Sequence, residues 1–315
     1  MKIVMLDAGT LGADLDLSPV TSLGEVDVYP SSAPDTVVSR LAGADVAVLN
    51  KIKMTRAVLE ALPDLKLICV TATGYDNIDL DCCRERGITL CNVPAYSTDS
   101  VAQVTVAMAL SLATHLPAYR AHVHEGTYSA SGVANHLTPV YHELSSMTWG
   151  VVGGGNIGGK VASIAAAIGC RVLVTRRRTD PVYQTVDIDT LVRESDIISL
   201  HLPLSEETRG MIDAARIAAM KKGAILINVA RGAVTDEEAL TCAIESGHLG
   251  GLGIDVFTVE PFDKAHPFTR ILERENVLLT PHMAWGSFEA RTRCLATVAE
   301  NITRFFAGNA QNKIV

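Results

Sequence analysis

The sequence predicts an α/β protein built from two doubly wound parallel-sheet domains. The chain has 315 residues, a length that corresponds to about two domains. Hydrophobic residues make up 48% of it, which is enough to fill a core in each domain. Short runs of β-branched and aliphatic residues alternate with longer helical patterns along the chain. This alternation is typical of a parallel sheet covered by helices on both faces.

Two sets of apolar runs are predicted to be strands, because each run is short, aliphatic and followed by a turn signal. The first set is Lys2–Leu6, Val26–Tyr29, Val46–Leu49, Leu67–Val70 and Ile88–Cys91. The second set is Trp149–Val152, Val172–Val174, Ile197–Leu200, Ala224–Val229, Leu252–Val256 and Val277–Leu279. Each set supplies the sheet of one domain.

Three longer segments connect or follow these sets. Ser97–Ala121 is predicted to be one long helix, because it starts with four cap-type residues and continues with an alanine-rich stretch. His122–Ser146 has no clear period and is too long for an ordinary connector. We expect it to be an arm that packs on the same chain or on a partner subunit. Ser287–Phe306 is again predicted to be helical.

The composition argues against nucleic acid, metal and membrane as partners. Lysine and arginine number 27 against 35 aspartates and glutamates, a net charge of −8, and the pI is near 5.6. The seven cysteines show no zinc-type spacing, so we expect free thiols in a reducing compartment. No apolar stretch approaches the roughly 18 residues of a membrane span. These features predict a cytoplasmic protein.

Gly153–Gly158 fits the pattern G-x-G-x-x-G of a dinucleotide-binding turn. The pattern alone is weak, but here it follows a predicted strand and opens the predicted helix Ile157–Ile168. Gly153 permits a tight turn, Gly155 lets the backbone approach a pyrophosphate, and Gly158 allows close packing of the helix. The helix N-terminus then binds the phosphates. A glycine-rich turn without a ligand is the alternative.

The residues after the next strand bear on the choice between NAD and NADP. An NAD-selective site carries Asp or Glu about 20 residues after the glycine turn, to bind the ribose 2′-hydroxyl. Arg176 stands there instead, with Thr175 and Arg177 beside it. Because arginine binds a 2′-phosphate well, we predict a preference for NADP(H), with NAD possible. The alternative is a solvated basic turn that does not discriminate.

Three charged residues, Arg231, Glu260 and His282, follow three successive predicted strands. The carboxyl ends of parallel strands meet at one rim, where ligands bind in open α/β sheets. This set predicts hydride transfer to a ketone. Arg231 would orient a substrate carboxylate and polarise the carbonyl. His282 would donate a proton to the forming alkoxide, and Glu260 would hold the imidazole.

Each of these residues taken alone has a simpler interpretation. An arginine and a glutamate at strand ends often form only a structural ion pair, and a histidine after a proline is usually a loop residue. The occurrence of all three behind a cofactor turn favours the catalytic interpretation.

The sequence resembles the D-isomer-specific 2-hydroxyacid dehydrogenases over nearly its whole length. The segments that carry the resemblance are Thr73–Asp79, Asn92–Ser97, Gly153–Gly158, His201–Pro203 with Thr208, Asn228–Leu240, Asp255–Pro261 and Thr280–Ala284. The run Val93–Gln103 is most similar to the glycerate dehydrogenase and hydroxypyruvate reductase branch.

The resemblance implies that Arg231, Glu260 and His282 are catalytic, and that the backbone around Thr73 and Gly74 holds the substrate carboxylate together with Arg231. It also implies cofactor contacts in addition to the turn glycines and Thr175–Arg177. These are at Asn156, Ile157, His201, Pro203, Thr208, Val229, Ala230, Arg231, Asp255 and His282, with Ser97 and Val101 near the nicotinamide.

The resemblance further implies how the chain is organised. A flavodoxin-like substrate domain would be discontinuous, formed by residues 1–98 and 287–315. A Rossmann NAD(P)-binding domain would occupy residues 99–286. Family members are typically homodimers whose cofactor domains embrace through a segment placed like His122–Ser146.

Two departures from the family pattern concern the cofactor: Asn156 stands where many relatives carry Arg, and Arg176 replaces the usual Asp. Phosphate binding would therefore depend more on backbone N–H groups.

We expect an NADP(H)-dependent reductase that converts hydroxypyruvate or glyoxylate to the D-2-hydroxy acid. One alternative is another branch, such as an NAD-dependent phosphoglycerate or D-lactate-type dehydrogenase. The other is a dinucleotide-sensing, corepressor-like binding protein. The presence of all three candidate catalytic residues, Arg231, Glu260 and His282, argues against it.

Overall fold

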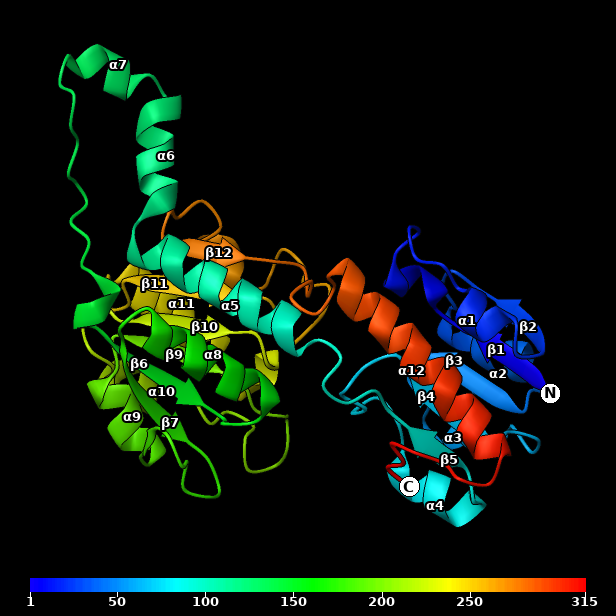
Figure 1. Cartoon of the computed structure of the whole chain (residues 1–315). Coiled ribbons are helices and arrows are strands. Elements are labelled where there is room, and N and C mark those ends of the chain that lie inside the picture. The colour runs from blue at the N-terminus through cyan, green and yellow to red at the C-terminus, as the bar shows by residue number, and fades with distance from the viewer. The chain divides into compact units, whose positions relative to one another are not determined.

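A computed structural model describes all 315 residues, from Met1 to Val315. The chain divides into two compact units, and both ends of the chain belong to the first (Figure 1). Unit 1 comprises Met1–Ser97 and Trp285–Val315, and unit 2 comprises Thr98–Ala284. The fold class expected from the sequence, two parallel-sheet α/β domains, is confirmed.

Unit 1 is built on a five-stranded parallel sheet with the order β2-β1-β3-β4-β5, which is the flavodoxin-like order. Its strands are β1 (Lys2–Met5), β2 (Glu25–Val28), β3 (Val46–Leu49), β4 (Leu67–Val70) and β5 (Thr89–Cys91). Strands β3 and β4 are apolar and buried along their whole length, as parallel strands covered on both faces must be.

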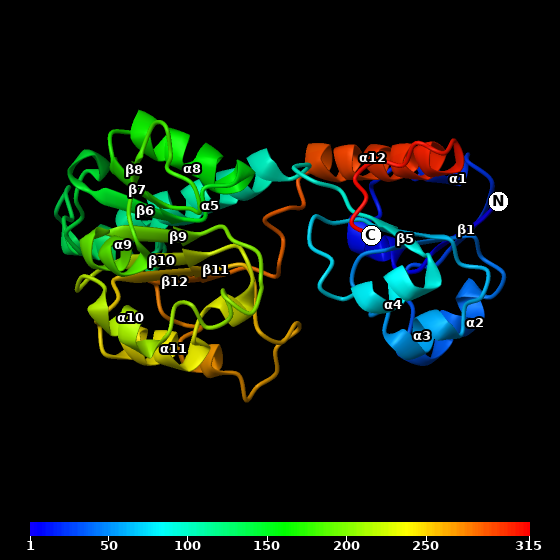
Figure 2. The ribbon, with the colours of Figure 1, turned by 90° about the horizontal axis from the view of Figure 1, so that it is seen from below.

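Helices cover both faces of this sheet (Figure 2). Helices α2, α3 and α4 pack in one apolar cluster, and α1 and α12 pack in another on the opposite face. Their bounds are α1 (Ser18–Thr21), α2 (Val37–Leu41), α3 (Arg56–Glu60), α4 (Leu80–Arg86) and α12 (Phe288–Phe306). The sheet is thus doubly wound.

Helix α12 explains how the end of the chain returns to unit 1. Ser287 caps its N-terminus by accepting a hydrogen bond from Ala290 N at 3.3 Å. Its buried apolar residues, Ala290, Cys294, Leu295, Val298 and Ile302, recur at helical spacing. After the helix, Ile314 N donates to Leu90 O at 2.8 Å, which ties the terminus to the edge strand β5.

Unit 2 is built on a seven-stranded parallel sheet with the order β12-β11-β10-β9-β6-β7-β8. Its strands are β6 (Thr148–Val152), β7 (Arg171–Thr175), β8 (Gln184–Thr185), β9 (Ile197–Leu200), β10 (Ile225–Asn228), β11 (Gly251–Ile254) and β12 (Val277–Leu279). The order reverses between β6 and β9, as in a Rossmann sheet. The sequence did not predict β8, because two polar residues at a sheet edge show no apolar alternation.

Two layers of helices cover the sheet of unit 2. Helices α5 and α8 pack with one apolar cluster, and α9, α10 and α11 with the other. Their bounds are α5 (Thr98–Ala113), α8 (Asn156–Ala167), α9 (Ile188–Glu194), α10 (Ala214–Ala219) and α11 (Glu237–Glu245). Five 3-10 turns complete the chain: η1 (Ala8–Leu11), η2 (Pro34–Thr36), η3 (Leu144–Ser146), η4 (Gly232–Val234) and η5 (Pro267–Arg270).

The prediction of one long helix over Ser97–Ala121 is wrong. Helix α5 ends at Ala113, and a second helix, α6 (Leu116–His124), starts after a bend of 62°. His115 at the break has a left-handed φ of 52°. Pro117 follows in the first turn of α6, where its missing N–H is tolerated, whereas a continuous helix would lose a hydrogen bond there.

No single helix is long and apolar enough to cross a membrane, and the bent pair α5 and α6 meets that test by length and composition only.

The segment after α5 forms an arm, Leu116–Ser146, that stands away from the sheet of unit 2 (Figure 1). Its outward limb is α6, its tip carries α7 (Thr127–Ser131), and the return limb is extended. The hydroxyl of Tyr119 donates to Pro139 O at 2.6 Å, and the rings of His122 and His136 stack with centroids 3.8 Å apart. These contacts hold the two limbs together.

Candidate active site

The glycine turn lies at the carboxyl end of β6 and opens helix α8. Gly153 has a positive φ of 96°, and its N–H donates to Thr175 O at 3.0 Å. A Cβ on Gly158 would lie 1.9 Å from Gly153 O, whereas a Cβ on Gly155 would meet nothing within 4 Å. The turn therefore needs glycine for its own packing, and Gly155 leaves open space at the helix N-terminus. This arrangement fits a dinucleotide pyrophosphate.

His201 follows β9 beside the glycine turn. Its N–H donates to Val152 O at 2.7 Å, while both of its ring nitrogens are buried without a hydrogen-bond partner. Burial lowers the pKa of His201 to about 3, so the ring is neutral at physiological pH. A buried neutral imidazole keeps one donor and one acceptor, which fits a polar group of a bound ligand at this rim.

The arginines after β7 are placed where the sequence predicts, but one of them has an unforeseen partner. Arg176 Nη1 lies 2.5 Å from Asp180 Oδ2, and the Asp180 carboxylate is largely buried. Hydrogen bonds from the Val182 amide, and then from Tyr183 and Arg176, lower the pKa of Asp180. Arg177 is 94% exposed. Arg176 is thus held in the turn by a carboxylate.

His282 and Glu260 form a pair at the ends of neighbouring strands. Nδ1 of His282 lies 2.7 Å from Oε2 of Glu260, and the two side chains are 21% and 27% exposed. The other oxygen of Glu260 accepts a hydrogen bond from Phe257 N at 3.0 Å. His282 has a left-handed φ of 51°, an uncommon conformation outside glycine that is typical of functional loops.

Asp255 fixes the turn that carries His282. Its buried carboxylate accepts hydrogen bonds from Thr280 Oγ1 at 2.6 Å, Met283 N at 2.8 Å and Ala284 N at 2.9 Å. Burial raises the pKa of Asp255, and these hydrogen bonds and the nearby His282 oppose the shift. From the sequence, Asp255 is expected only as a cofactor contact. Its position directly after β11, beside the β12 turn, was the signal for this further role.

Arg231 follows β10, the next strand in the sheet order. Asn228 braces its turn, because its side chain donates to Arg231 O at 2.9 Å and accepts from Ala230 N at 3.0 Å. Arg231 Nη1 donates to Ala230 O at 2.8 Å. A Cβ on Gly232 would lie 2.0 Å from the carbonyl carbon of Phe257, so the arginine turn packs backbone to backbone against the loop that carries Glu260.

Several of the remaining predicted residues lie in unit 2. Asn156 and Ile157 form the first turn of α8, and Val229 and Ala230 link β10 to Arg231. Thr208 closes the loop after β9, because its hydroxyl donates to Pro203 O at 2.7 Å and accepts from Ser205 N at 2.7 Å.

Thr73 and Gly74 belong to unit 1, where they follow β4. Asn92 Nδ2 donates to Thr73 O at 2.8 Å, and Thr73 Oγ1 donates to Val93 O at 2.8 Å. Ser97 is the last residue of that unit before α5, and Val101 is buried on α5 in unit 2. No group of three or more His, Cys, Asp or Glu side chains could hold a metal ion.

Comparison with known proteins identifies the family. Residues 106–284 match the model of the D-isomer specific 2-hydroxyacid dehydrogenase, NAD binding domain. The whole chain is 34% identical over 323 residues to the hydroxypyruvate reductase of Blautia hydrogenotrophica, of which it covers 99%. The chain belongs to the D-isomer-specific 2-hydroxyacid dehydrogenase family. The resemblance read from the sequence motifs is confirmed.

Two further relatives agree with this assignment. The dehydrogenase is 35% identical over 314 residues to the glycerate dehydrogenase of Methylorubrum extorquens, with 99% of this chain and 98% of that protein covered. An acyclic imino acid reductase solved in complex with NADPH and D-Arg superposes with a TM-score of 0.88 at 29% identity, and both chains are covered completely. This dehydrogenase is therefore an oxidoreductase that acts on CH–OH groups with a nicotinamide dinucleotide.

Proposed function

We propose that the dehydrogenase reduces a small 2-keto acid, hydroxypyruvate or glyoxylate, to the D-2-hydroxy acid and prefers NADPH. The observation that carries the proposal is the 2.7 Å contact between His282 and Glu260 at strand ends adjacent to that of Arg231. Relatives named hydroxypyruvate reductase and glycerate dehydrogenase align over nearly the whole chain, which supports this substrate class.

The bound cofactor would supply the hydride to the keto carbon of the substrate. His282 would donate its proton to the forming alkoxide, and would take it back in the reverse direction. Glu260 would hold the imidazole and balance its charge while it is protonated. Arg231 would bind the carboxylate of the substrate and polarise the carbonyl. Thr73 and Gly74 would hold a substrate carboxylate through backbone N–H groups, as the family resemblance implies.

The preference for NADPH rests on Arg176, with Thr175 and Arg177 as helpers. Its guanidinium stands at the end of β7, where an NAD-selective protein carries a carboxylate. A bound 2′-phosphate would compete with Asp180 for that guanidinium, so the ion pair keeps Arg176 in the turn when no phosphate is present. The similar imino acid reductase was solved with NADPH.

A panel of 2-keto acids assayed with both cofactors tests the proposal. Hydroxypyruvate and glyoxylate should give the highest kcat/KM, and NADPH should exceed NADH with either acid. Faster turnover of pyruvate-type or phosphorylated acids would contradict the substrate proposal, and equal or better use of NADH would contradict the cofactor proposal.

We also propose that the arm mediates a homodimer. Leu137, Val140 and Val133 on its return limb are 75%, 70% and 60% exposed, which is unusual for large aliphatic side chains grouped on one segment. Sedimentation should show a dimer, and the double variant Leu137→Asp with Val140→Asp should be a folded monomer. A monomeric unmodified protein would contradict this proposal.

A further inference from the structure

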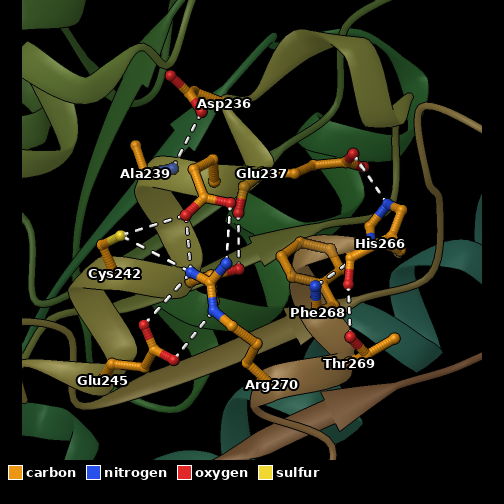
Figure 3. Close-up of polar contacts among 11 residues, drawn as sticks. Asp236, Glu237, Ala239, Cys242, Glu245, His266, Phe268, Thr269 and Arg270 are labelled. Carbon is orange, nitrogen blue, oxygen red and sulfur yellow. Dashed lines mark hydrogen bonds and ion pairs between the residues drawn. The ribbon is translucent and has the colours of Figure 1, made fainter. Parts of the chain in front are cut away.

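The geometry points to a second carboxylate–imidazole pair, Glu237 and His266, that positions Glu260 for catalysis by holding the Thr258 peptide. This inference rests on the proposed role of the His282–Glu260 pair. Glu237 and His266 are positioning residues, because they contact the loop that carries Glu260. Figure 3 shows the carboxylate of Glu237 and the ring of His266 facing each other.

The Glu237 carboxylate is buried and bound at both of its oxygens. Oε2 lies 3.0 Å from His266 Nε2, and the two side chains are only 11% and 7% exposed. Oε1 accepts a hydrogen bond from Thr258 N at 2.8 Å. Asp236 caps the helix by accepting from Ala239 N at 3.0 Å, which fixes the first turn from which Glu237 extends.

The hydrogen bonds of His266 fix its tautomer. Phe268 N donates to Nδ1 at 3.3 Å, so Nδ1 is the acceptor and the proton lies on Nε2, which donates to Glu237. The rings of Phe262 and Phe268 lie 4.7 and 5.1 Å from the imidazole, centroid to centroid. These contacts bury the imidazole, whose N–H is directed at Glu237.

Two consecutive amides connect this pair to the catalytic pair. Thr258 N donates to Glu237, and the preceding amide, Phe257 N, donates to Glu260 Oε1 at 3.0 Å. The same peptide sits directly on Gly232, whose Cβ would lie 2.2 Å from Thr258 N. Because the two amides are consecutive in the backbone, a shift of Thr258 moves the amide that orients Glu260. Glu260 in turn is the partner of His282.

A neighbouring ion-pair network on the same helix provides a matched control. Arg270 binds Glu238 at 2.7 Å and Glu245 at 3.1 Å. These glutamates are 57% and 36% exposed, and they contact Arg270 and Cys242, away from the Thr258 peptide. Glu238→Gln therefore removes an ion pair next to Glu237 without loosening the loop.

The test compares Glu237→Gln with Glu238→Gln. Gln replaces one of the two carboxylate oxygens by an NH2 donor, which would face the N–H of either Thr258 or His266, so one of the two hydrogen bonds is lost. We expect Glu237→Gln to lower kcat about 10- to 100-fold, the scale of a misplacement near 1 Å. The KM for the keto acid and the Kd for NADPH should change less than about twofold, because the proposed contacts of these two ligands do not include Glu237. Glu238→Gln should leave all three values within about twofold.

A double-mutant cycle separates positioning from general damage. In a Glu260→Gln background, Glu237→Gln should cost less than about twofold, since no carboxylate remains to be oriented. His266→Phe keeps an aromatic ring in the cluster and should lower kcat in the wild-type and Glu260→Gln backgrounds as Glu237→Gln does. It replaces Glu237→Gln in the test if that variant does not fold. Amide hydrogen exchange at Thr258 should rise in Glu237→Gln and stay unchanged in Glu238→Gln.

Two results would overturn the inference while leaving the proposed function intact. One is a wild-type kcat in both Glu237→Gln and His266→Phe. The other is a drop in kcat on adding Glu237→Gln that is as large in the Glu260→Gln background as in the wild-type protein. By contrast, near-normal turnover of His282→Ala and Glu260→Gln would overturn the proposed function itself.

Discussion

The Oε2 atom of Glu260 lies 2.7 Å from Nδ1 of His282, so the imidazole that follows β12 is held by a carboxylate that follows β11. Neighbouring strands of a parallel sheet deliver the two residues to one rim. Asp255 fixes the backbone of the histidine turn, and Phe257 N fixes the glutamate. This pair is the centre of the proposed chemistry.

Replacing His282 by Ala should lower kcat for keto-acid reduction by a factor on the order of 10²–10⁴, the range for loss of a general acid. Steady-state kinetics measure this, with NADPH affinity and melting temperature as controls that should change little. Turnover near the wild-type value would remove His282 from the mechanism.

Replacing Arg176 by Asp should shift the preference from NADPH toward NADH. A carboxylate at this position repels the 2′-phosphate and can accept the ribose 2′-hydroxyl. The ratio of kcat/KM for the two cofactors is the measurement. Arg178→Asp, in the same basic turn, serves as the control for net charge and should leave the ratio nearly unchanged. An unchanged ratio in Arg176→Asp would show that Arg176 does not select the cofactor.

Two adjacent glycines of α8 should respond oppositely to alanine. Gly158→Ala places a Cβ 1.9 Å from Gly153 O, so it should lower the free energy of unfolding by at least about 1–3 kcal/mol and weaken NADPH binding. Gly159→Ala meets nothing within 4 Å and should stabilise the helix by up to about 1 kcal/mol. Denaturant unfolding and cofactor titration measure both effects, and similar behaviour of the two variants would contradict the close packing of the turn.

His201 should make the cofactor-free protein sensitive to acid. Its pKa is lowered from 6.5 to about 3 in the folded state, so between these values the unfolded chain binds more protons and the stability falls as the pH falls. From pH 7 to pH 5 this should cost about 2 kcal/mol. In His201→Gln the loss of unfolding free energy over that interval should be smaller by this amount. His142→Gln on the exposed arm is the control, and an equal acid loss in His201→Gln and wild type would contradict the burial of the ring.

The strands and helices could be predicted from the sequence where local residue patterns determine them. The aliphatic runs gave every strand except β8, and Ser287 marked the start of α12 within one residue. The break at His115 was not predicted, because the alanine-rich pattern favours a continuous helix. Pro117 was the available signal, since a proline inside a helical pattern indicates an end or a kink.

The residues of the candidate site could be predicted only in part, because the direction of a side chain depends on tertiary contacts. Arg176 could be located by its distance from the glycine turn, but its pairing with Asp180 could not. Glu237 and His266 are 29 residues apart and lie in unrelated patterns, so only the fold shows that they meet. Asp255 could be predicted as a site residue from its position after a strand. Its three hydrogen bonds to the histidine turn are visible only in the structure.

The most direct measurement follows the hydride itself. Hydroxypyruvate should be incubated with the protein and NADPH deuterated at the transferable position, and the product analysed by mass spectrometry and chiral chromatography. We expect D-glycerate with one deuterium at C2, and far less product with His282→Ala. Formation of L-glycerate, or no labelled hydroxy acid from any small 2-keto acid, would contradict it.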